Sequence, residues 1–539
     1  MPLDTGNGLA NLMLGNFRNY NQASAAVYPY FRFLAHEAYA QDSWKVSKRL
    51  TVEFGIRFEH QVPTFTYTRG GTVGGEGTWT LYSVDLSKYN SGSRPTIDLS
   101  SGKLVGDPMK ALSPLGLVCD PCSGTPRGFS PTKNLFAPRL GFAYDVFGDG
   151  KTAIRSGFGV FHERLRQNNF YFGAAGNWPN LSNASALNGN VSNVDTSVTA
   201  GPAPAITPPG LSVWPSDNTV PTVYSWYFGI QHQLPAKFTL DVSYSGNHTV
   251  HLMDQRSVNG LPAGTFVTNP NLSQSVNYRN DALRPYYGWG SLTAIETLAT
   301  SSYNAMMFRI SRRYANSLSV NFNYTYSKAM DIVDNDSDAI INPFNMRQNW
   351  APAGYDQTHV VTVDWVYDLP RVHGALDNAF GRAALNGWQV NGLFRSQSGT
   401  PFSVTSNGST MGVDSGGQYP NLIGDPYAGQ NNGQWINPAA FARPQDGQYG
   451  NLHRNALRLP HITNVDASLI KNFVIRENMR LTFRAETFNL FNHTQIWGIN
   501  TGFNGDNPGS LISANTKNLG QPNAFRDARI LQLALRFSF

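Results

Sequence analysis

The strongest constraint on the fold is a strict alternation of apolar and polar residues that recurs in thirteen segments of the chain. In the clearest one, the apolar positions are Leu531, Leu533, Leu535, Phe537 and Phe539. A period of two residues is typical of a β-strand with one apolar and one polar face. The pattern therefore predicts an all-β fold.

The predicted strands lie near residues 33–45, 50–60, 136–146, 151–162, 224–230, 238–244, 303–313, 318–326, 361–367, 385–397, 463–474, 480–489 and 531–539. Most are about 10 to 12 residues long. Strands of soluble proteins average about 5 to 6 residues, whereas a tilted strand that crosses a bilayer needs about 9 to 11. Strand length therefore favours a membrane-spanning sheet.

The connections between these strands alternate between short and long. Turns of a few residues around Ser47, Asp149, Pro235 and Asn316 are each followed by a connection of about thirty residues or more. Outer-membrane barrels have short periplasmic turns and long extracellular loops. A closed barrel also pairs every backbone group inside the lipid. We expect a transmembrane antiparallel β-barrel in the cell outer membrane, with the C-terminus in the periplasm.

Aromatic residues cluster near the predicted strand ends. Trp44, Tyr367, Trp388 and Phe539 lie on the short-turn side. Trp and Tyr are enriched where a membrane meets water, so this distribution indicates an interfacial girdle and outer-membrane lipid as a partner.

Composition excludes several other classes of protein. Aromatic residues make up 12% of the 539 residues, which is too many for a disordered chain. The formal charge of +6 comes from 41 basic and 35 acidic residues without a basic run, so we expect no nucleic-acid partner. No apolar run reaches the roughly 18 to 20 residues of a membrane helix. The stretch from Met1 to Asp4 does not begin a signal peptide.

The odd strand number leads to an expectation about the ends of the chain. If the long loops lie outside and the C-terminus lies in the periplasm, the first of thirteen strands runs from the outside towards the periplasm. Single-chain bacterial barrels have even strand numbers, so a preceding strand is missing. We therefore expect an N-terminally truncated sequence. Residues 1–30 are predicted to be a residual extracellular loop or partial strand, and residues 31–539 the barrel with its long loops.

Several motifs resemble one known family. They include Ala38-Tyr-Ala-Gln-Asp-Ser-Trp-Lys-Val46, Phe136-Ala-Pro-Arg-Leu-Gly-Phe-Ala-Tyr144, Tyr324-Thr-Tyr-Ser-Lys328, Ser398-Gly-Thr-Pro-Phe402 and Ala485-Glu-Thr-Phe-Asn-Leu-Phe-Asn-His493. In this order, and over nearly the whole chain, they resemble the barrel of Oar-like TonB-dependent receptors.

The resemblance implies a barrel of about 22 strands. It also implies a plug, a carboxypeptidase-regulatory-like domain and a TonB-box segment, none of which these residues contain, so TonB is a partner only if they exist upstream. The terminal aromatics Phe537 and Phe539 match the signal read by the barrel-assembly machinery. Phe539 can equally complete the girdle.

Four short motifs were weighed as sites. Asp334, Asp336 and Asp338 alternate like the first ligands of a calcium loop, but Ala339 stands where the sharp turn needs Gly, so a solvated acidic loop is favoured over calcium. His248 and His251 make a poor zinc pair. Cys119 and Cys122 are predicted to form a loop disulfide rather than a metal site. Gly150-Lys151-Thr152 lacks the first Gly of a phosphate loop and predicts a hairpin turn.

The charges predicted to face the barrel lumen are expected to pair with one another or with a plug. They are Glu53, Arg57, Arg139, Arg155, Asp241, Asp364, Arg395, Arg484, Glu486 and Arg536.

No catalytic motif occurs in the sequence, so we predict a protein that is not an enzyme and assign no catalytic residue. The favoured hypothesis is a TonB-dependent transporter or receptor barrel that moves or binds a large substrate, which the sequence does not identify. The alternatives are a plugless outer-membrane pore and a surface-anchored binding or adhesion protein. A secreted β-propeller is disfavoured because no repeat of about 40 to 50 residues occurs.

Overall fold

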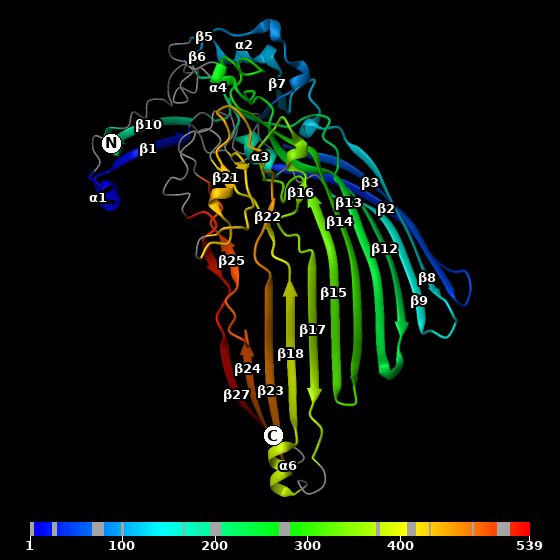
Figure 1. The fold of residues 1–539 in the computed structure, drawn as a ribbon. Coiled ribbons are helices and arrows are strands. Elements are labelled where there is room, and N and C mark those ends of the chain that lie inside the picture. The colour runs from blue at the N-terminus through cyan, green and yellow to red at the C-terminus, as the bar shows by residue number, and fades with distance from the viewer. Residues whose placement is uncertain are drawn as a thin grey trace.

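Thirteen strands form the antiparallel path of a 15-stranded sheet, in the order β2-β3-β8-β9-β12-β13-β14-β15-β17-β18-β23-β24-β27 (Figure 1). Off this path, β11 (Leu211–Val213) pairs with β14 in parallel and β16 (Ala351–Pro352) pairs with β15. The computed structural model describes residues 5–23, 30–66, 80–98, 102–164, 168–181, 183–193, 206–268, 281–372, 378–406, 417–430, 433–476, 479–503 and 518–539. Neighbouring strands of this path also follow one another in the sequence. Such a meander is the simplest topology for strands joined alternately by short turns and long loops.

The sheet strands are β2 (Phe31–Lys45), β3 (Leu50–Thr66), β8 (Lys133–Asp145), β9 (Thr152–His162), β12 (Thr222–Gln233), β13 (Phe238–Ser257), β14 (Leu292–Ala315), β15 (Leu318–Asp331), β17 (His359–Asp368), β18 (Trp388–Gln397), β23 (Ile462–Arg476), β24 (Met479–Phe488) and β27 (Ile530–Ser538). All thirteen predicted strands are confirmed. The main error lies at the long-loop end, where β13 and β14 reach 20 and 24 residues and extend well beyond the predicted segments.

One face of the sheet is apolar across consecutive strands. Phe54 lies opposite Leu140, and Leu140 lies opposite Phe158 on the next strand. Leu140 is 57% exposed, and much of this face is similarly uncovered. Register specifies this surface, because a slip of one residue would turn every apolar side chain to the other face.

The opposite face is polar. Thr362 of β17 lies opposite Arg395 of β18, which lies opposite Asn464 of β23. Asn321 donates to Asp364 across β15 and β17 at 2.7 Å. The two faces of the sheet therefore carry opposite chemistry, as the alternation predicts.

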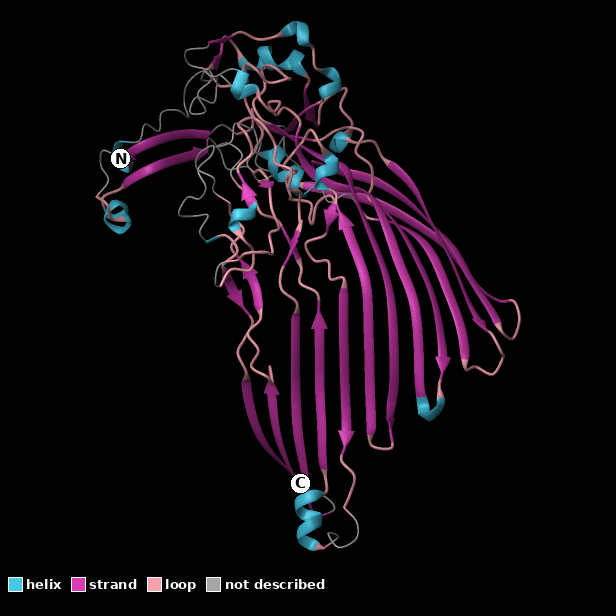
Figure 2. Ribbon diagram, viewed as in Figure 1, coloured by secondary structure: helices cyan, strands magenta, loops and turns pink. Residues whose placement is uncertain are grey.

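The long loops fold into a cap above one end of the sheet (Figure 2). Its short strands are β4 (Leu81–Val84), β5 (Ile97–Asp98), β6 (Lys103–Leu104), β7 (Leu117–Asp120), β10 (Asn183–Asn190), β11 (Leu211–Val213), β16 (Ala351–Pro352), β19 (Pro401–Phe402), β20 (Asn421–Leu422), β21 (Phe441–Ala442), β22 (Leu457–Arg458), β25 (Ile496–Ile499) and β26 (Pro522–Phe525). Its helices are α2 (Pro108–Leu112), α3 (Asn168–Ala175) and α4 (Thr265–Thr268). We call this layer of folded connections the loop cap.

The loop cap has its own apolar cores. One contains Trp289, which is fully buried and donates from its indole Nε1 to the carbonyl of Leu115 at 3.1 Å. Another contains Trp214, whose Nε1 donates to Ser130 Oγ at 2.7 Å. A third gathers residues from 404 to 519. The long connections are therefore packed structures, which the strand pattern did not predict.

The sheet ends in two open edges within the described residues. β2 pairs only with β3, and β27 pairs only with β24. Near the N-terminus, α1 (Gly8–Met13) precedes β1 (Asn16–Ala23), which pairs with β10 away from the main sheet. These elements fall within the region predicted as a loop or partial strand.

The connections at the other end are short, as predicted. Between β8 and β9, the carboxylate of Asp145 accepts hydrogen bonds from the amides of Gly148 and Gly150 at 2.9 and 3.0 Å. Both glycines have positive φ, the conformation that a tight turn requires. The hairpin interpretation of Gly150-Lys151-Thr152 is confirmed. The longest connection here contains α6 (Ala379–Leu385), far from the loop cap (Figure 1).

Among the described helices, none combines the length and the apolar character that a membrane crossing demands.

Glycine lets tryptophan lie flat across neighbouring strands. An added Cβ at Gly246 would stand 2.6 Å from Cε2 of Trp226 on the paired strand. Gly246→Ala is expected to lower the free energy of unfolding by about 1–3 kcal/mol, the usual cost of overpacking. Denaturant unfolding of the refolded protein measures this loss.

Gly157→Ala is the matched control, because the nearest atom to its added Cβ would lie 3.8 Å away, at ordinary van der Waals distance. Equal stability of the two variants would contradict the assigned role of Trp226.

Candidate functional site in the inner sheet face and the loop cap

Two grooves open along the polar face of the sheet. The first, of about 700 Å³, is lined by residues that include Glu53, Arg139 and Tyr227. The second, of about 650 Å³, includes Asp241, Arg309 and Asn323. Alternating charges and amides on these walls provide donors and acceptors for a hydrated or polar ligand. No described side chain pair here has the arrangement of a nucleophile and its base.

The predicted pairing of inward charges holds for part of the set. Arg57 forms ion pairs with Glu37 and, at 3.4 Å, with Glu59. Arg484 and Glu486 lie 3.5 Å apart. Arg139 stacks instead on the ring of Phe161, with its guanidinium carbon 4.7 Å from the ring centroid.

Other members of that set lie in register with polar residues. Asp241 lies opposite Arg309, and Arg395 lies opposite Thr362 and Asn464. For Glu53, Arg155 and Arg536, pairing stays a prediction.

A buried arginine joins two loops of the cap. Arg454 forms an ion pair with Asp331 at the end of β15 and another with Asp334 in the following loop, the latter at 2.9 Å. Its Nη2 also donates to the carbonyl of Asp331 at 2.8 Å. The side chains of Arg454 and Asp331 are 12% and 2% exposed. The loop of residues 398–461 is thereby attached to the strand end.

A second arginine repeats this attachment. Arg458 pairs with the buried carboxylate of Asp356 and donates from Nη1 to the carbonyl of Gly399 at 3.1 Å. Between the two arginines, Asn455 donates to the carbonyl of Pro352 at 2.9 Å. Three closely spaced residues of one loop thus contact the end of β15, β16 and the segment that precedes β17.

A third buried charge cluster lies on β13 and β14. Asp254 is fully buried and sits opposite Glu296 in the register of the two strands. Glu296 pairs with Arg256, whose Nη2 donates to it at 3.1 Å. The Asp254 carboxylate has no hydrogen-bond partner of normal geometry. Arg256 therefore pairs with Glu296, while the Asp254 carboxylate lies opposite Glu296 in a water-poor position.

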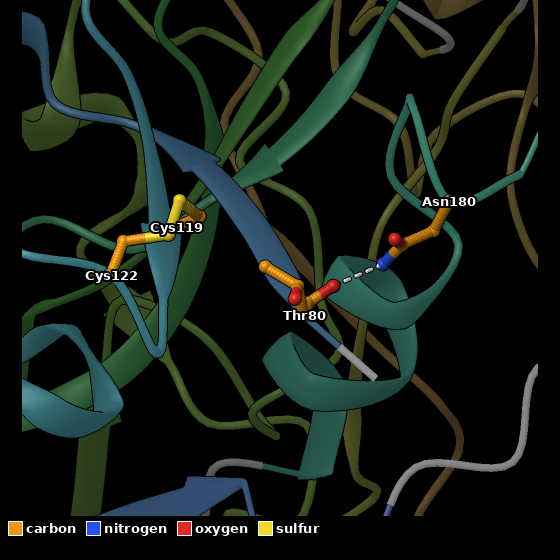
Figure 3. The surroundings of a disulfide bond; sticks show 4 residues. All are labelled: Thr80, Cys119, Cys122 and Asn180. Carbon is orange, nitrogen blue, oxygen red and sulfur yellow. Dashed lines mark hydrogen bonds between the residues drawn. A yellow bond between two sulfur atoms is a disulfide. The ribbon is translucent and has the colours of Figure 1, made fainter. Parts of the chain in front are cut away.

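Cys119 and Cys122 form a disulfide in the loop cap, with their Cα atoms 5.3 Å apart (Figure 3). Cys119 belongs to β7, where it lies opposite Tyr82 of β4. Nearby, Asn180 donates to the carbonyl of Thr80 at 2.6 Å, which ties α3 and its following turn to the same hairpin. The pair is structural in its setting, at the surface of a packed loop.

In the loop of Asp334, Asp336 and Asp338, carboxylates accept hydrogen bonds from backbone amides of the protein. Asp338 accepts from the amides of Asp334 and Asn335 at 3.0 and 3.2 Å. Asp334 accepts from the amide of Gly354 at 2.6 Å as well as pairing with Arg454. Asp336 lies beside the Asp334 carboxylate in a groove of about 310 Å³. Calcium at this loop stays a prediction.

The predicted histidine pair lies on β13, where the ladder is irregular. His251 has a φ of 62°, and the register shifts between Thr249 and Leu252. Within the described part of the chain, no group of three or more His, Cys, Asp or Glu side chains is placed to hold a metal ion.

The terminal aromatics end the last strand. Phe537 continues the apolar row of β27, and Phe539 is 93% exposed beyond it. Their ring centroids are 5.9 Å apart. The role of these residues in barrel assembly stays a prediction.

Sequence reasoning missed the buried ion pairs of the loop cap. Asp331 and Arg454 are separated by 123 residues, so no local spacing connects them. The only available signal was a pair of arginines four residues apart in a loop otherwise rich in Gly, Asn and Gln.

The sequence matches one family model, described as an outer membrane beta barrel domain, over residues 2–532. The chain belongs to this family. The apolar face of the sheet is therefore the lipid-facing surface of a barrel wall, and the polar face is its lumen side. No curated protein matches the sequence significantly.

The solved structures that resemble this chain have low sequence identity to it. They include the ferric-catecholate import receptor Fiu from K12 E. coli, at 12% identity and a TM-score of 0.40, with 93% of this chain and 44% of that chain covered. The ferripyoverdine receptor of the outer membrane of Pseudomonas aeruginosa has 10% identity and a TM-score of 0.41, with 94% and 39% covered. The barrel chain thus spans less than half the length of these two proteins.

Replacement of Arg454, which joins two loops of the cap, should lower the stability of the loop cap. Arg454→Met leaves the buried carboxylate of Asp331 without its partner. Loss of one member of a buried ion pair typically lowers the free energy of unfolding by about 3–5 kcal/mol. We expect faster hydrogen exchange in the described part of the 398–461 loop. Arg454→Met combined with Asp331→Asn should recover much of the protection, because the unpaired charge is gone. Unchanged exchange in the single variant would refute this attachment.

The stability of the loop cap should depend on pH through Asp254. A strand needs about 11 residues to cross the bilayer. Counted from the start of β13 at Phe238, Asp254 lies past that length and therefore outside the membrane. Burial, and secondly Glu296, raises the pKa of Asp254 to about 7. The folded state therefore retains a proton that the unfolded state has lost above about pH 4, and stability falls as pH rises from about 4 to 7.

Asp254→Asn should flatten this dependence and stabilise the cap at pH 8, as measured by thermal melting at pH 5 and pH 8. The exposed Asp217→Asn is the control and should keep the wild-type profile. A wild-type profile in Asp254→Asn would disprove the assignment.

Proposed function

We propose that the chain is the barrel portion of an Oar-like TonB-dependent receptor, which binds or moves a large substrate across the outer membrane. The observation that carries this proposal is the combination of a polar, charged lumen face with long loops folded into a packed cap. A simple anchor needs neither feature. The family membership and the ordered motifs that resemble Oar-like receptors support the same function.

The proposed orientation places the loop cap outside the cell and the short turns in the periplasm, since barrels of this class have short periplasmic turns. Substrate capture then belongs to the loop cap, and passage to the grooved lumen face. The contacts of Arg454, Asn455 and Arg458 with the end of β15, with β16 and with the segment before β17 favour a preformed capture surface. Such a surface binds with a smaller ordering cost than a flexible one.

We further propose that the thirteen strands are part of a larger barrel of about 22 strands. The two open edges, at β2 and β27, support this idea, because an open edge in lipid leaves backbone groups unpaired. Phe539, at the exposed end of β27, is proposed as the signal read by the barrel-assembly machinery.

The test is isolation of the native protein from the outer-membrane fraction of its host, with measurement of its intact mass and of cross-linking to TonB. The proposal predicts a mass well above the 59.3 kDa of these residues and a TonB adduct. A membrane protein of about 59.3 kDa without a TonB adduct would overturn it. Channel conductance would then identify a plugless pore, and its absence a surface-anchored binding protein.

A further inference from the structure

The helix α6 is held against the short-turn end of the barrel wall by two side chains. Trp388 donates from Nε1 to the carbonyl of Ala384 at 2.8 Å. The Lys471 ammonium donates to the same carbonyl at 3.2 Å and also to that of Asn386. The carbonyls at a helix C-terminus lack partners within the helix and attract a positive charge. The end of α6 is therefore fixed to β18 and β23.

Both anchoring residues belong to the lipid-facing surface. Trp388 lies opposite Lys471, and two residues further along the strands Val390 lies opposite Leu469. Leu469 is part of the apolar face and is 38% exposed. A lysine on this face is strongly destabilising at the bilayer midplane and nearly neutral near the interface.

The surroundings of Lys471 are those of a residue at the border between lipid and water. Its side chain is only 2% exposed, and its ammonium lies 5.1 Å from the ring centroid of Trp388 and 5.0 Å from that of Phe473. Ring faces and helix carbonyls replace water around the charge. The charge of Lys471 is therefore shielded from the lipid where α6 meets the barrel wall.

The helix presents large apolar side chains that the protein leaves uncovered. Phe380 is 82% exposed, and Leu385 is 44% exposed. Other exposed aromatics occur at the short-turn ends of the wall, namely Trp44, Phe147, Tyr314 and Tyr367. Phe380 thus adds an exposed aromatic side chain to those at the short-turn ends of the wall.

We propose that α6 is a membrane-interface anchor, which lies among the phospholipid headgroups of the leaflet at the short-turn end with Phe380 inserted between the upper acyl chains. Continuity with the lipid-facing wall through Trp388 and Lys471 selects lipid, rather than a partner protein, as the occupant of this surface. The proposal rests on membership of the outer-membrane barrel family and does not depend on transport.

A spin label tests this placement, because both native cysteines are bonded to each other and leave an introduced cysteine as the single reactive thiol. The barrel carrying Phe380→Cys is labelled with a nitroxide and reconstituted in vesicles of phosphatidylethanolamine and phosphatidylglycerol. Collision rates with oxygen, which concentrates in lipid, and with a water-soluble nickel chelate then report depth. Met306→Cys, on the lipid-facing wall, and Lys48→Cys, in the exposed β2–β3 turn, supply the lipid and water references.

The proposal predicts more oxygen than nickel collisions at position 380, at a depth between the two references. Values like those at position 48 would show a helix in water and overturn it. A label shielded from both reagents would indicate coverage by protein and would equally overturn it.

A second variant tests the anchor itself. Lys471→Met in the labelled protein removes the bonds to α6 while keeping an apolar side chain on the wall. The nitroxide at position 380 should then become more mobile and more accessible to nickel, by severalfold relative to the parent. Unchanged mobility and depth would show that Lys471 does not hold the helix.

Discussion

The structure depends on the backbone ladder of one antiparallel sheet whose two faces differ in chemistry. In lipid, an unpaired backbone amide or carbonyl costs several kcal/mol, so strands must pair along their whole length. Consecutive pairing from β2 to β27 meets this requirement inside the sheet and leaves one side of β2 and one side of β27 unpaired among the described residues. The period of two residues then decides which surface meets lipid and which meets water.

The loop cap follows from that ladder. Strands that extend past the bilayer, such as β13 and β14, carry their pairing into the cap and provide it with a rigid base. On this base the loops bury tryptophans and join through arginines that reach buried aspartates. Buried ion pairs are costly to form and costly to break, so they favour one arrangement of the loops over others. A cap with one arrangement is suited to selective capture.

The strand pattern predicted the wall because it is a local property. The alternation of Leu531, Leu533 and Leu535 with smaller or polar residues shows within a few positions which face each side chain occupies. The turn at Gly148 and Gly150 was equally local. The cap was not predictable in this way, because Arg454 and Asp331 are 123 residues apart in the sequence and meet only in the folded chain. The extent of β14 was missed for a related reason, since most side chains of its first third are buried whichever face they lie on, and the alternation is lost.

The most direct test of the two-faced wall is a cysteine scan along β15 in reconstituted vesicles, with a lipid-soluble and a water-soluble thiol reagent. The native cysteines are bonded to each other, so each introduced cysteine reports alone. Positions 320, 322 and 324 should react with the lipid-soluble reagent, and positions 321, 323 and 325 with the water-soluble one. Uniform labelling by the water-soluble reagent at all six positions would contradict a membrane-spanning wall.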